Sequence, residues 1–228
     1  MKNIFIVLFL LKVSCAFSFP VQELKSVQDL PLELSVSRGI KNTLVIYLTG
    51  DGGLNSFSRK LIQELENGGY GVVSLNTRKY FRKEQTPDNF ARDIAYLSGY
   101  YMKEWEKTSV FIVGYSFGAD VAAFLPRRLP LDLLEKTTCI ALLSPSASTD
   151  FVIKLTDLIG DSRNIKRKYK VGRELNESTF PVVCIFGAKE DLKLKSTLQK
   201  NENVTVHILP GSHQYNDNHV LLIKMIGL

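Results

Sequence analysis

The chain has 228 residues, of which 45% are hydrophobic and 23% charged, so it holds enough apolar residues for one globular domain with a sizeable core. Its formal net charge of +6 is a modest basic excess, which favours anionic surfaces but is too dispersed to indicate a nucleic-acid-binding protein. The sequence shows no internal repeat and no low-complexity tract, which argues against a repeat architecture.

The first 18 residues have the pattern of a secretory signal peptide. Lys2 gives a positive start, Ile4–Leu11 is a short apolar run, and residues 16–18 (Ala-Phe-Ser) form a small-x-small cleavage site. The apolar run is too short to span a membrane, and no later stretch is long enough. We therefore expect residues 1–18 to be removed on export, which leaves residues 19–228 as a single domain.

Strand-like apolar runs alternate with helical patterns along the rest of the chain. An edge strand is expected in Leu30–Val36, and residues Ser144–Thr179 form the least regular part, which we interpret as an excursion from the core that covers the site. Alternation of this kind predicts a mostly parallel sheet with helices on both faces, the α/β class. The expected strands are Asn42–Leu48, Tyr70–Leu75, Ser109–Tyr115, Lys136–Leu143, Phe180–Phe186 and Val204–Leu209, and the expected helices are Ser56–Asn67, one that Thr86 caps and Pro87 begins, one directly after Ser116, and Asp217–Ile226.

The strand that ends at Tyr115 runs into Gly114-Tyr115-Ser116-Phe117-Gly118, which fits G-x-S-x-G. A strand, a sharp turn and a helix around this pattern predict a nucleophile elbow, in which Ser116 stands above the sheet beside free helical N–H groups. The alternative is a glycine-rich turn with an idle serine. In parallel sheets, ligands bind beyond the carboxyl ends of the strands, where Ser116 falls together with the loops that follow the other strands.

A serine nucleophile needs a base, and a carboxylate must orient that base. Among the histidines, His213 follows the last strand and has the right position in the chain order, whereas His207 lies within that strand and His219 in the closing helix. For the acid, Asp191 and Glu190 compete on the loop after Phe186, and we choose Asp191 because aspartate is the commoner triad acid. A triad of this kind works without a metal or cofactor, so we expect neither.

The oxyanion hole needs two N–H donors, for which we propose the backbone of Phe117 and of Asp51 in the Gly50–Gly53 loop. The same loop can be a plain tight turn. A carboxylate at Asp51 is awkward beside an oxyanion, but it suits an acyl group that carries an ammonium. We therefore expect Gly50, Asp51, Gly52 and Tyr115 to contact substrate, while Asp120 is interpreted as a helix-terminus residue that complements the helix dipole.

Two further features are a pair of cysteines and a run of basic residues. Cys139 and Cys184 lie in separate strand-like runs, where side chains rarely meet disulfide geometry, so we expect buried free thiols. The basic run Arg163–Arg173 is either a solvated loop or a contact for anionic lipid head groups.

Taken together, several motifs resemble the VirJ/AcvB family of bacterial periplasmic α/β-hydrolases, in its short VirJ form. The resemblance extends from about Asn42 to the end of the chain. The motifs are residues Leu48–Gly53 (LTGDGG), Tyr80-Phe81 followed by Thr86-Pro87, Gly114–Asp120 (GYSFGAD), Leu129-Pro130 and Leu209–His213 (LPGSH). Two departures are that Gln214 stands where family members commonly have a histidine, and that no cysteine follows the acid to pair with Cys184.

The resemblance implies the α/β-hydrolase fold, periplasmic location and hydrolysis of aminoacyl-phosphatidylglycerol, notably the lysyl form. It gives Ser116, Asp191 and His213 the roles of nucleophile, acid and base. It also implies an association with type IV secretion in plant-associated bacteria. Two rival interpretations remain open: a serine esterase or thioesterase with another substrate, and a non-catalytic binding protein of a secretion system on a hydrolase scaffold.

Overall fold

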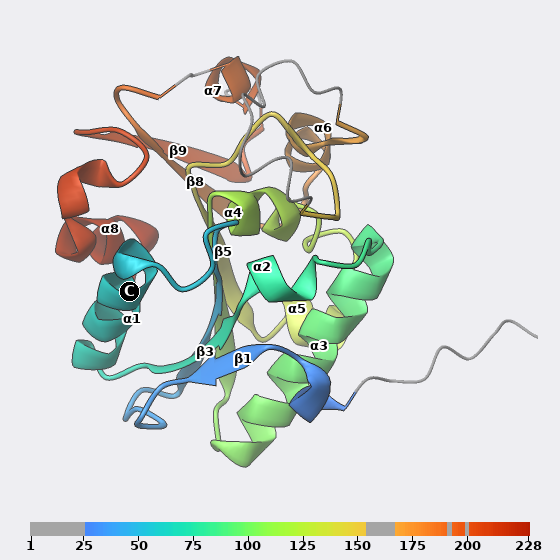
Figure 1. Ribbon diagram of the computed structural model, residues 1–228, viewed down its shortest axis with the longest axis vertical. Coiled ribbons are helices and arrows are strands. Elements are labelled where there is room, and N and C mark those ends of the chain that lie inside the picture. The colour runs from blue at the N-terminus through green and yellow to red at the C-terminus, as the bar shows by residue number, and fades with distance from the viewer. Residues whose placement is uncertain (1–25, 154–166, 191–192, 199–200) are drawn as a thin grey trace, which may run out of the picture.

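The computed structural model describes residues 26–153, 167–190, 193–198 and 201–228 (Figure 1). The predicted signal peptide, Asp191 and the first part of the basic run lie outside these residues. No helix in the described part is long and apolar enough to cross a membrane.

A twisted sheet organises the fold, and its seven strands lie in the order β1-β3-β2-β4-β5-β8-β9. Neighbouring strands pair in parallel except β1, which pairs antiparallel with β3 at the edge. This arrangement confirms the predicted, mostly parallel sheet and its edge strand. The strands are β1 (Leu32–Leu34), β2 (Thr43–Leu48), β3 (Gly71–Leu75), β4 (Ser109–Tyr115), β5 (Thr137–Leu143), β8 (Val182–Gly187) and β9 (Val204–Leu209).

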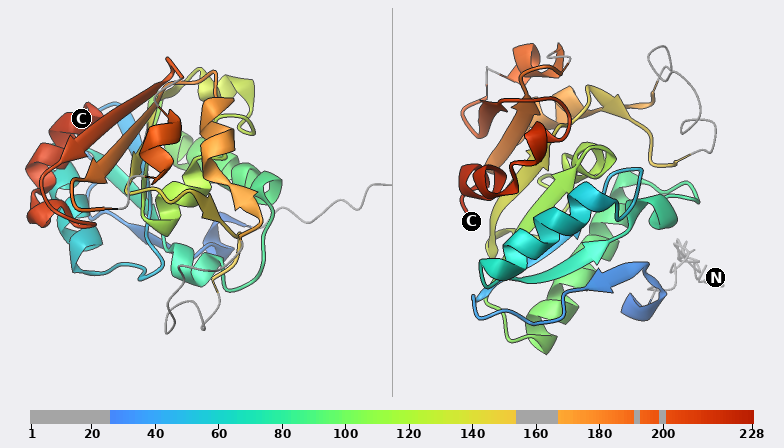
Figure 2. Two further views of the ribbon diagram at one scale, coloured as in Figure 1. Left: turned by 90° about the horizontal axis from the view of Figure 1, so that it is seen from above. Right: turned by 60° about the vertical axis from the view of Figure 1, so that its left-hand side comes forward.

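Helices cover both faces of this sheet (Figures 1 and 2). On one face α1 and α8 pack side by side, and on the other α3 packs against β2 and β4. The predicted bounds of α1 and the predicted start of α3 are confirmed, whereas α8 begins two residues later than expected. The helices are α1 (Ser56–Asn67), α2 (Thr77–Tyr80), α3 (Pro87–Glu104), α4 (Phe117–Ala122), α5 (Leu131–Leu134), α6 (Val171–Asn176), α7 (Lys193–Leu198) and α8 (His219–Ile226), with 3-10 turns η1 (Val27–Asp29) and η4 (Tyr215–Asp217).

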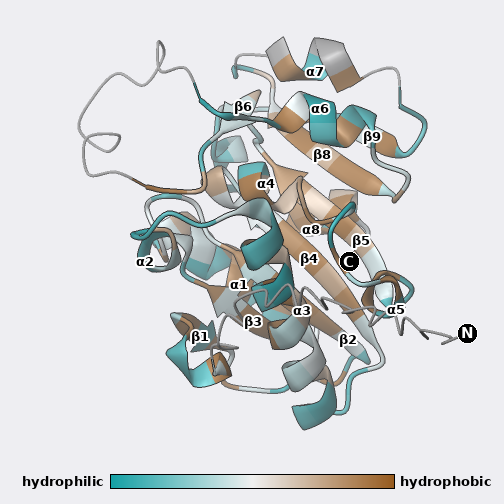
Figure 3. Cartoon of the chain, turned by 90° about the vertical axis from the view of Figure 1, so that its right-hand side faces the viewer, coloured by the Kyte–Doolittle hydropathy of each residue, from teal (hydrophilic) through white to brown (hydrophobic). Residues whose placement is uncertain are grey.

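Two apolar cores lie on the two faces of the sheet, because successive strand residues point to opposite sides. In β2, Val45 and Tyr47 join the core under α1 and α8, whereas Ile46 and Leu48 join the core under α3. The central strands are accordingly hydrophobic along most of their length (Figure 3). A sheet buried on both faces gives rigid strand ends, on which a site can be built.

The excursion after β5 contains a two-stranded hairpin of β6 (Ser148–Thr149) and β7 (Tyr169–Lys170), followed by α6. The ring of Phe151 packs against those of Phe124 at the end of α4 and Tyr169 in β7, with ring centroids 5.2 and 5.0 Å apart. The hairpin therefore sits on the helix that follows Ser116.

Both cysteines in the described part are free, as predicted, but only Cys184 is fully buried and Cys139 is partly exposed. Burial raises the pKa of Cys139 to about 11 and raises that of Cys184 as well. Neither thiol is therefore set up as a nucleophile.

Candidate active site

Ser116 occupies the turn between β4 and α4 with φ 54° and ψ −120°, a strained conformation for a residue with a side chain. The two glycines of the motif make this turn feasible. A Cβ at Gly114 would lie 2.5 Å from the Gly118 carbonyl oxygen, and one at Gly118 would lie 2.3 Å from the carbonyl oxygen of Leu48. The geometry is that of the predicted elbow, and the Ser116 side chain remains partly accessible.

His213 lies on the loop after β9, where its Nε2 is 2.8 Å from Ser116 Oγ. Close packing of backbones holds this loop, since a Cβ at Gly187 would lie 2.3 Å from the Ser212 carbonyl oxygen. The structure thus brings together the serine and the histidine that the sequence singles out. His219 is instead buried against the ring of Phe57, with ring centroids 4.7 Å apart.

The carboxylate beside His213 is that of Glu190, whose Oε1 lies 2.6 Å from His213 Nδ1. This contact favours Glu190, the alternative that the sequence left open, while the preferred Asp191 lies outside the described residues. The physical reason is the turn at the end of β8. The Glu190 N–H donates to the Gly187 carbonyl, and the long Glu190 side chain folds back so that its Oε2 accepts the Gly187 N–H at 2.6 Å.

Two residues that sequence reasoning missed support this carboxylate. Ser144, at the end of β5, donates its hydroxyl to Glu190 Oε2 at 2.8 Å. The Tyr215 hydroxyl lies 2.6 Å from Ser144 Oγ and donates to the Ile185 carbonyl at 2.9 Å. The only sequence signal for Ser144 was its place directly after a predicted strand.

The pKa of Glu190 reflects these contacts. Partial burial raises the pKa, but hydrogen bonds from His213, the Gly187 N–H and the Ser144 hydroxyl outweigh burial and hold it below its ordinary value. Glu190 is therefore ionised at neutral pH and can accept the Nδ1 proton of His213. The Nε2 of that tautomer is then free to accept the hydroxyl proton of Ser116.

The Gly50–Gly53 loop is a tight turn that approaches the nucleophile closely. Its Gly53 N–H donates to the Gly50 carbonyl at 2.9 Å, and a Cβ at Gly50 would lie 3.3 Å from the Ser116 Cβ. The buried Thr77 hydroxyl, at the start of α2, ties the loop down through the carbonyls of Thr49 and Gly50. Asp51 is consequently held at the turn with its side chain exposed.

Two backbone N–H groups are candidates for an oxyanion hole. Phe117 is the first residue of α4, so its N–H has no intrahelical acceptor. The Asp51 N–H lies on the turn that approaches Ser116. The Gly50–Gly53 loop and the start of α4 therefore both lie beside Ser116, where the sequence predicts the two donors.

Tyr115 differs from its predicted role as a substrate contact. The side chain is only 3% exposed, and its ring lies between those of Phe57 and His213, with centroids 4.3 and 5.2 Å away. We therefore interpret Tyr115 as a support for the His213 ring.

Asp120 lies in the first turn of α4, as predicted for a residue that complements the helix dipole. Its carboxyl group is buried and accepts the Ser146 N–H at 2.5 Å. Burial raises the pKa of Asp120 to about 7, although Ser146, Arg167 and His213 act to lower it. The contact joins the helix after Ser116 to the excursion that follows β5.

Comparisons with known proteins agree with this architecture. A family model described as "Bacterial virulence protein (VirJ)" matches residues 42–227. No curated protein sequence matches the chain. Among solved structures, Est1E from Butyrivibrio proteoclasticus with bound ferulic acid is similar at TM-score 0.62 and 16% identity, covering 88% of this chain and 94% of that one. A lipase-esterase related protein from Clostridium acetobutylicum reaches TM-score 0.60 at 17% identity, covering 86% and 99%. These likenesses show the α/β-hydrolase fold.

Proposed function

The chain belongs to the VirJ family of bacterial virulence proteins, and we propose that it is a serine hydrolase that cleaves carboxylic esters. One observation carries this proposal: the unbroken line of hydrogen bonds from Ser116 through His213 to Glu190, at a strained strand-to-helix turn. Such an arrangement supplies a nucleophile, its base and the group that orients the base.

The proposed mechanism proceeds through an acyl-enzyme. Ser116 Oγ attacks the ester carbonyl while His213 Nε2 takes the hydroxyl proton, and Glu190 stabilises the imidazolium that forms. The N–H groups of Phe117 and Asp51 bind the oxyanion of the tetrahedral intermediate. His213 then gives its proton to the departing alcohol. A water molecule, deprotonated by His213, then attacks the acyl-enzyme. The tetrahedral intermediate that forms collapses, which releases the acid, and His213 returns the proton to Ser116 Oγ.

For the substrate, we propose the aminoacyl ester of aminoacyl-phosphatidylglycerol, lysyl or alanyl. The family resemblance supports this class. The exposed carboxylate of Asp51, on the loop that approaches Ser116, supports an acyl group with an α-ammonium. The products would be a free amino acid and phosphatidylglycerol. The signal-like pattern of residues 1–18 supports a periplasmic location for this reaction.

The test is release of free amino acid from vesicles that contain lysyl- or alanyl-phosphatidylglycerol, by wild type and by Ser116→Ala. Release that vanishes in the variant supports the proposal, and the relative rates give the preferred amino acid. No release, with a serine-reactive phosphonate still labelling Ser116, would keep the hydrolase and discard the lipid substrate. No release and no labelling would favour a binding protein, whose partner contacts would survive Ser116→Ala.

A further inference from the structure

Positively charged side chains gather beside the candidate active site from two segments that lie far apart in the sequence. The first segment is α2 with the loop after it, and the second is residues 167–173, which contain β7 and the start of α6. We call this set the basic rim: Arg78, Lys79, Arg82, Lys83, Arg167, Lys168, Lys170 and Arg173, all exposed except Arg167, which is half-buried.

Backbone hydrogen bonds hold the first segment to the residues after β6, and β6 pairs with β7 of the second segment. The Ile153 N–H donates to the Phe81 carbonyl, and the Gln85 N–H donates to the Phe151 carbonyl, both at 2.8 Å. The ring of Phe151 packs between those of Phe81 and Tyr169, with centroids 5.8 and 5.0 Å away. The loop after α2 and the β6–β7 hairpin therefore form one continuous surface, and both lie on the same side of the molecule in Figure 3.

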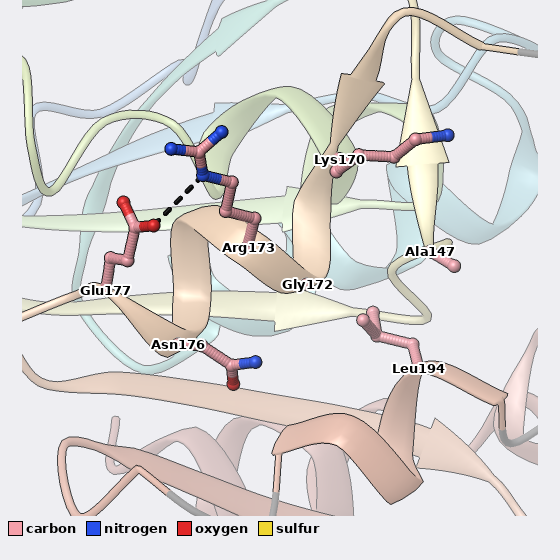
Figure 4. A pocket seen from close by; sticks show the side chains of 7 residues that line it. All are labelled: Ala147, Lys170, Gly172, Arg173, Asn176, Glu177 and Leu194. Atoms are coloured by element: carbon pink, nitrogen blue, oxygen red, sulfur yellow. Dashed lines mark hydrogen bonds and ion pairs between the residues drawn. The ribbon is translucent and has the colours of Figure 1, made fainter.

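Two adjoining hollows open on this surface. One, of about 570 Å³, is lined by Glu84 from the first segment and by residues 167–170 from the second. The other, of about 430 Å³, lies between α6 and α7 and is lined by Lys170, Arg173 and Leu194 among others (Figure 4). Lys170 lines both hollows, so the two adjoin at a cation. The carboxylates of Glu84, Asp150 and Glu177 also line them, but the cations of the basic rim outnumber these carboxylates.

Most of these charges are available to an external anion. Within the described part of the chain, Arg78, Lys79, Arg82 and Lys83 form no ion pair. Lys170 Nζ donates to a backbone carbonyl, that of Arg167, at 3.1 Å. Arg173 does pair with Glu177, at 3.0 Å.

The basic rim borders the edge of the sheet that carries Ser116. α2 follows the carboxyl end of β3, and the hairpin follows that of β5, as Ser116 follows that of β4. Arg167 lies close enough to Asp120, on the helix after Ser116, to act on its ionisation. A flat anionic partner on the basic rim would therefore face the opening above Ser116.

We propose that the basic rim is a docking surface for an anionic phospholipid bilayer. Lys and Arg side chains pair with lipid phosphodiesters, and each cation near such a surface strengthens partition about fivefold. Docking of this kind would orient the protein with Ser116 towards the head groups. The biological sense of this inference rests on the proposed function, but its test uses vesicles that contain no substrate.

The experiment compares binding to phosphatidylglycerol–phosphatidylcholine vesicles by co-sedimentation. The rim variant carries Arg82→Gln, Lys83→Gln, Arg167→Gln and Lys168→Gln. A matched control variant carries Lys41→Gln, Lys103→Gln, Lys136→Gln and Lys224→Gln, exposed positions near the amino ends of the strands. Both variants lose four positive charges, so they differ only in where the charge is removed. Turnover of a soluble neutral ester, or phosphonate labelling if no ester is accepted, checks that each variant is folded.

We expect the partition coefficient of the rim variant to fall at least about tenfold, and that of the control variant to fall about twofold. The difference should shrink as salt screens the charges. Equal losses in the two variants, or equal binding to pure phosphatidylcholine vesicles, would overturn the inference. Rim-dependent binding without amino-acid release would contradict the proposed substrate alone, and release with rim-independent binding would contradict the docking surface alone.

Discussion

Glu190 and Asp120 are two carboxyl groups at the same edge of the sheet, and their pKa values move in opposite directions. Glu190 receives hydrogen bonds from His213, Gly187 and Ser144, and its pKa is lowered. Asp120 is more deeply buried, with Ser146 as its hydrogen-bonding partner, and its pKa rises to about 7. The hydrogen-bond donors around a carboxylate, set against its burial, therefore decide whether it is charged at neutral pH.

The largest effect should come from Glu190→Gln. Glutamine keeps a similar shape but cannot balance the charge of an imidazolium or hold the correct tautomer, so kcat should fall by about 10³- to 10⁴-fold. The matched control is Asp191→Asn, at the acid that the sequence favoured, which should leave kcat within about threefold of wild type. The opposite pattern in steady-state kinetics would return the acid role to Asp191.

A third carboxylate, that of Asp51, should affect the choice of substrate. Asp51→Asn removes the charge that would pair with an α-ammonium and leaves the backbone N–H in place. We expect kcat/KM for an aminoacyl ester to fall about tenfold or more, and that for a matched neutral acyl ester about twofold. Equal losses on the two substrates would remove Asp51 from ammonium recognition.

A smaller effect is expected from Ser144→Ala, which deletes one donor to Glu190. The Glu190 carboxylate would then lose one hydrogen bond, so the pKa of Glu190 should rise. We expect kcat to fall about tenfold with KM little changed. Ser146→Ala is the control, since Ser146 contacts Asp120 rather than Glu190, through its backbone N–H and its hydroxyl. A loss of activity as large in Ser146→Ala would show that the two carboxyl groups are not independent.

The smallest effect on activity, and a clear one on stability, should come from Asp120→Asn. The pKa of Asp120 is about 7 in the folded protein against 3.8 for the free side chain, so in this window the unfolded chain releases a proton that the folded chain keeps. The contribution of Asp120 to the free energy of unfolding therefore decreases as pH rises towards 7, by up to about 4 kcal/mol. Asp120→Asn should raise Tm at pH 8 more than at pH 4, and turnover should stay within about twofold.

Glu190 should show the opposite pH dependence. Because its folded-state pKa lies below the ordinary value, its stabilising contribution is present above that value and is lost as pH falls through the folded pKa. Thermal melts of Glu190→Gln should show a weaker loss of Tm in acid than wild type shows. If both variants changed Tm in the same pH window, the contrast between the two carboxyl groups would be wrong.

Sequence reasoning succeeded where a residue's role follows from local pattern. Continuous apolar runs predicted β2 and β4, and a helical pattern predicted α1. The two glycines around Ser116 identified the elbow. All of these features depend on neighbours in the chain. The position of His213 after the last strand followed from topology alone.

The remainder depended on distant contacts. The choice between Glu190 and Asp191 rests on how the Glu190 side chain folds back over the turn at Gly187, which composition does not reveal. Ser144 and Tyr215 meet across 71 positions of sequence. The short strands β6 and β7 carry no periodicity of their own, and an aromatic cluster that includes Phe124 and Phe151 holds them in place.

The most direct test of the account is reaction of the protein with a fluorophosphonate, followed by peptide mass spectrometry. The arrangement of Ser116, His213 and Glu190 predicts one adduct, on Ser116, formed at a rate that falls steeply in His213→Ala and Glu190→Gln. No adduct on Ser116 would contradict the claim that this serine is an activated nucleophile. So would a labelling rate in both variants equal to that of wild type.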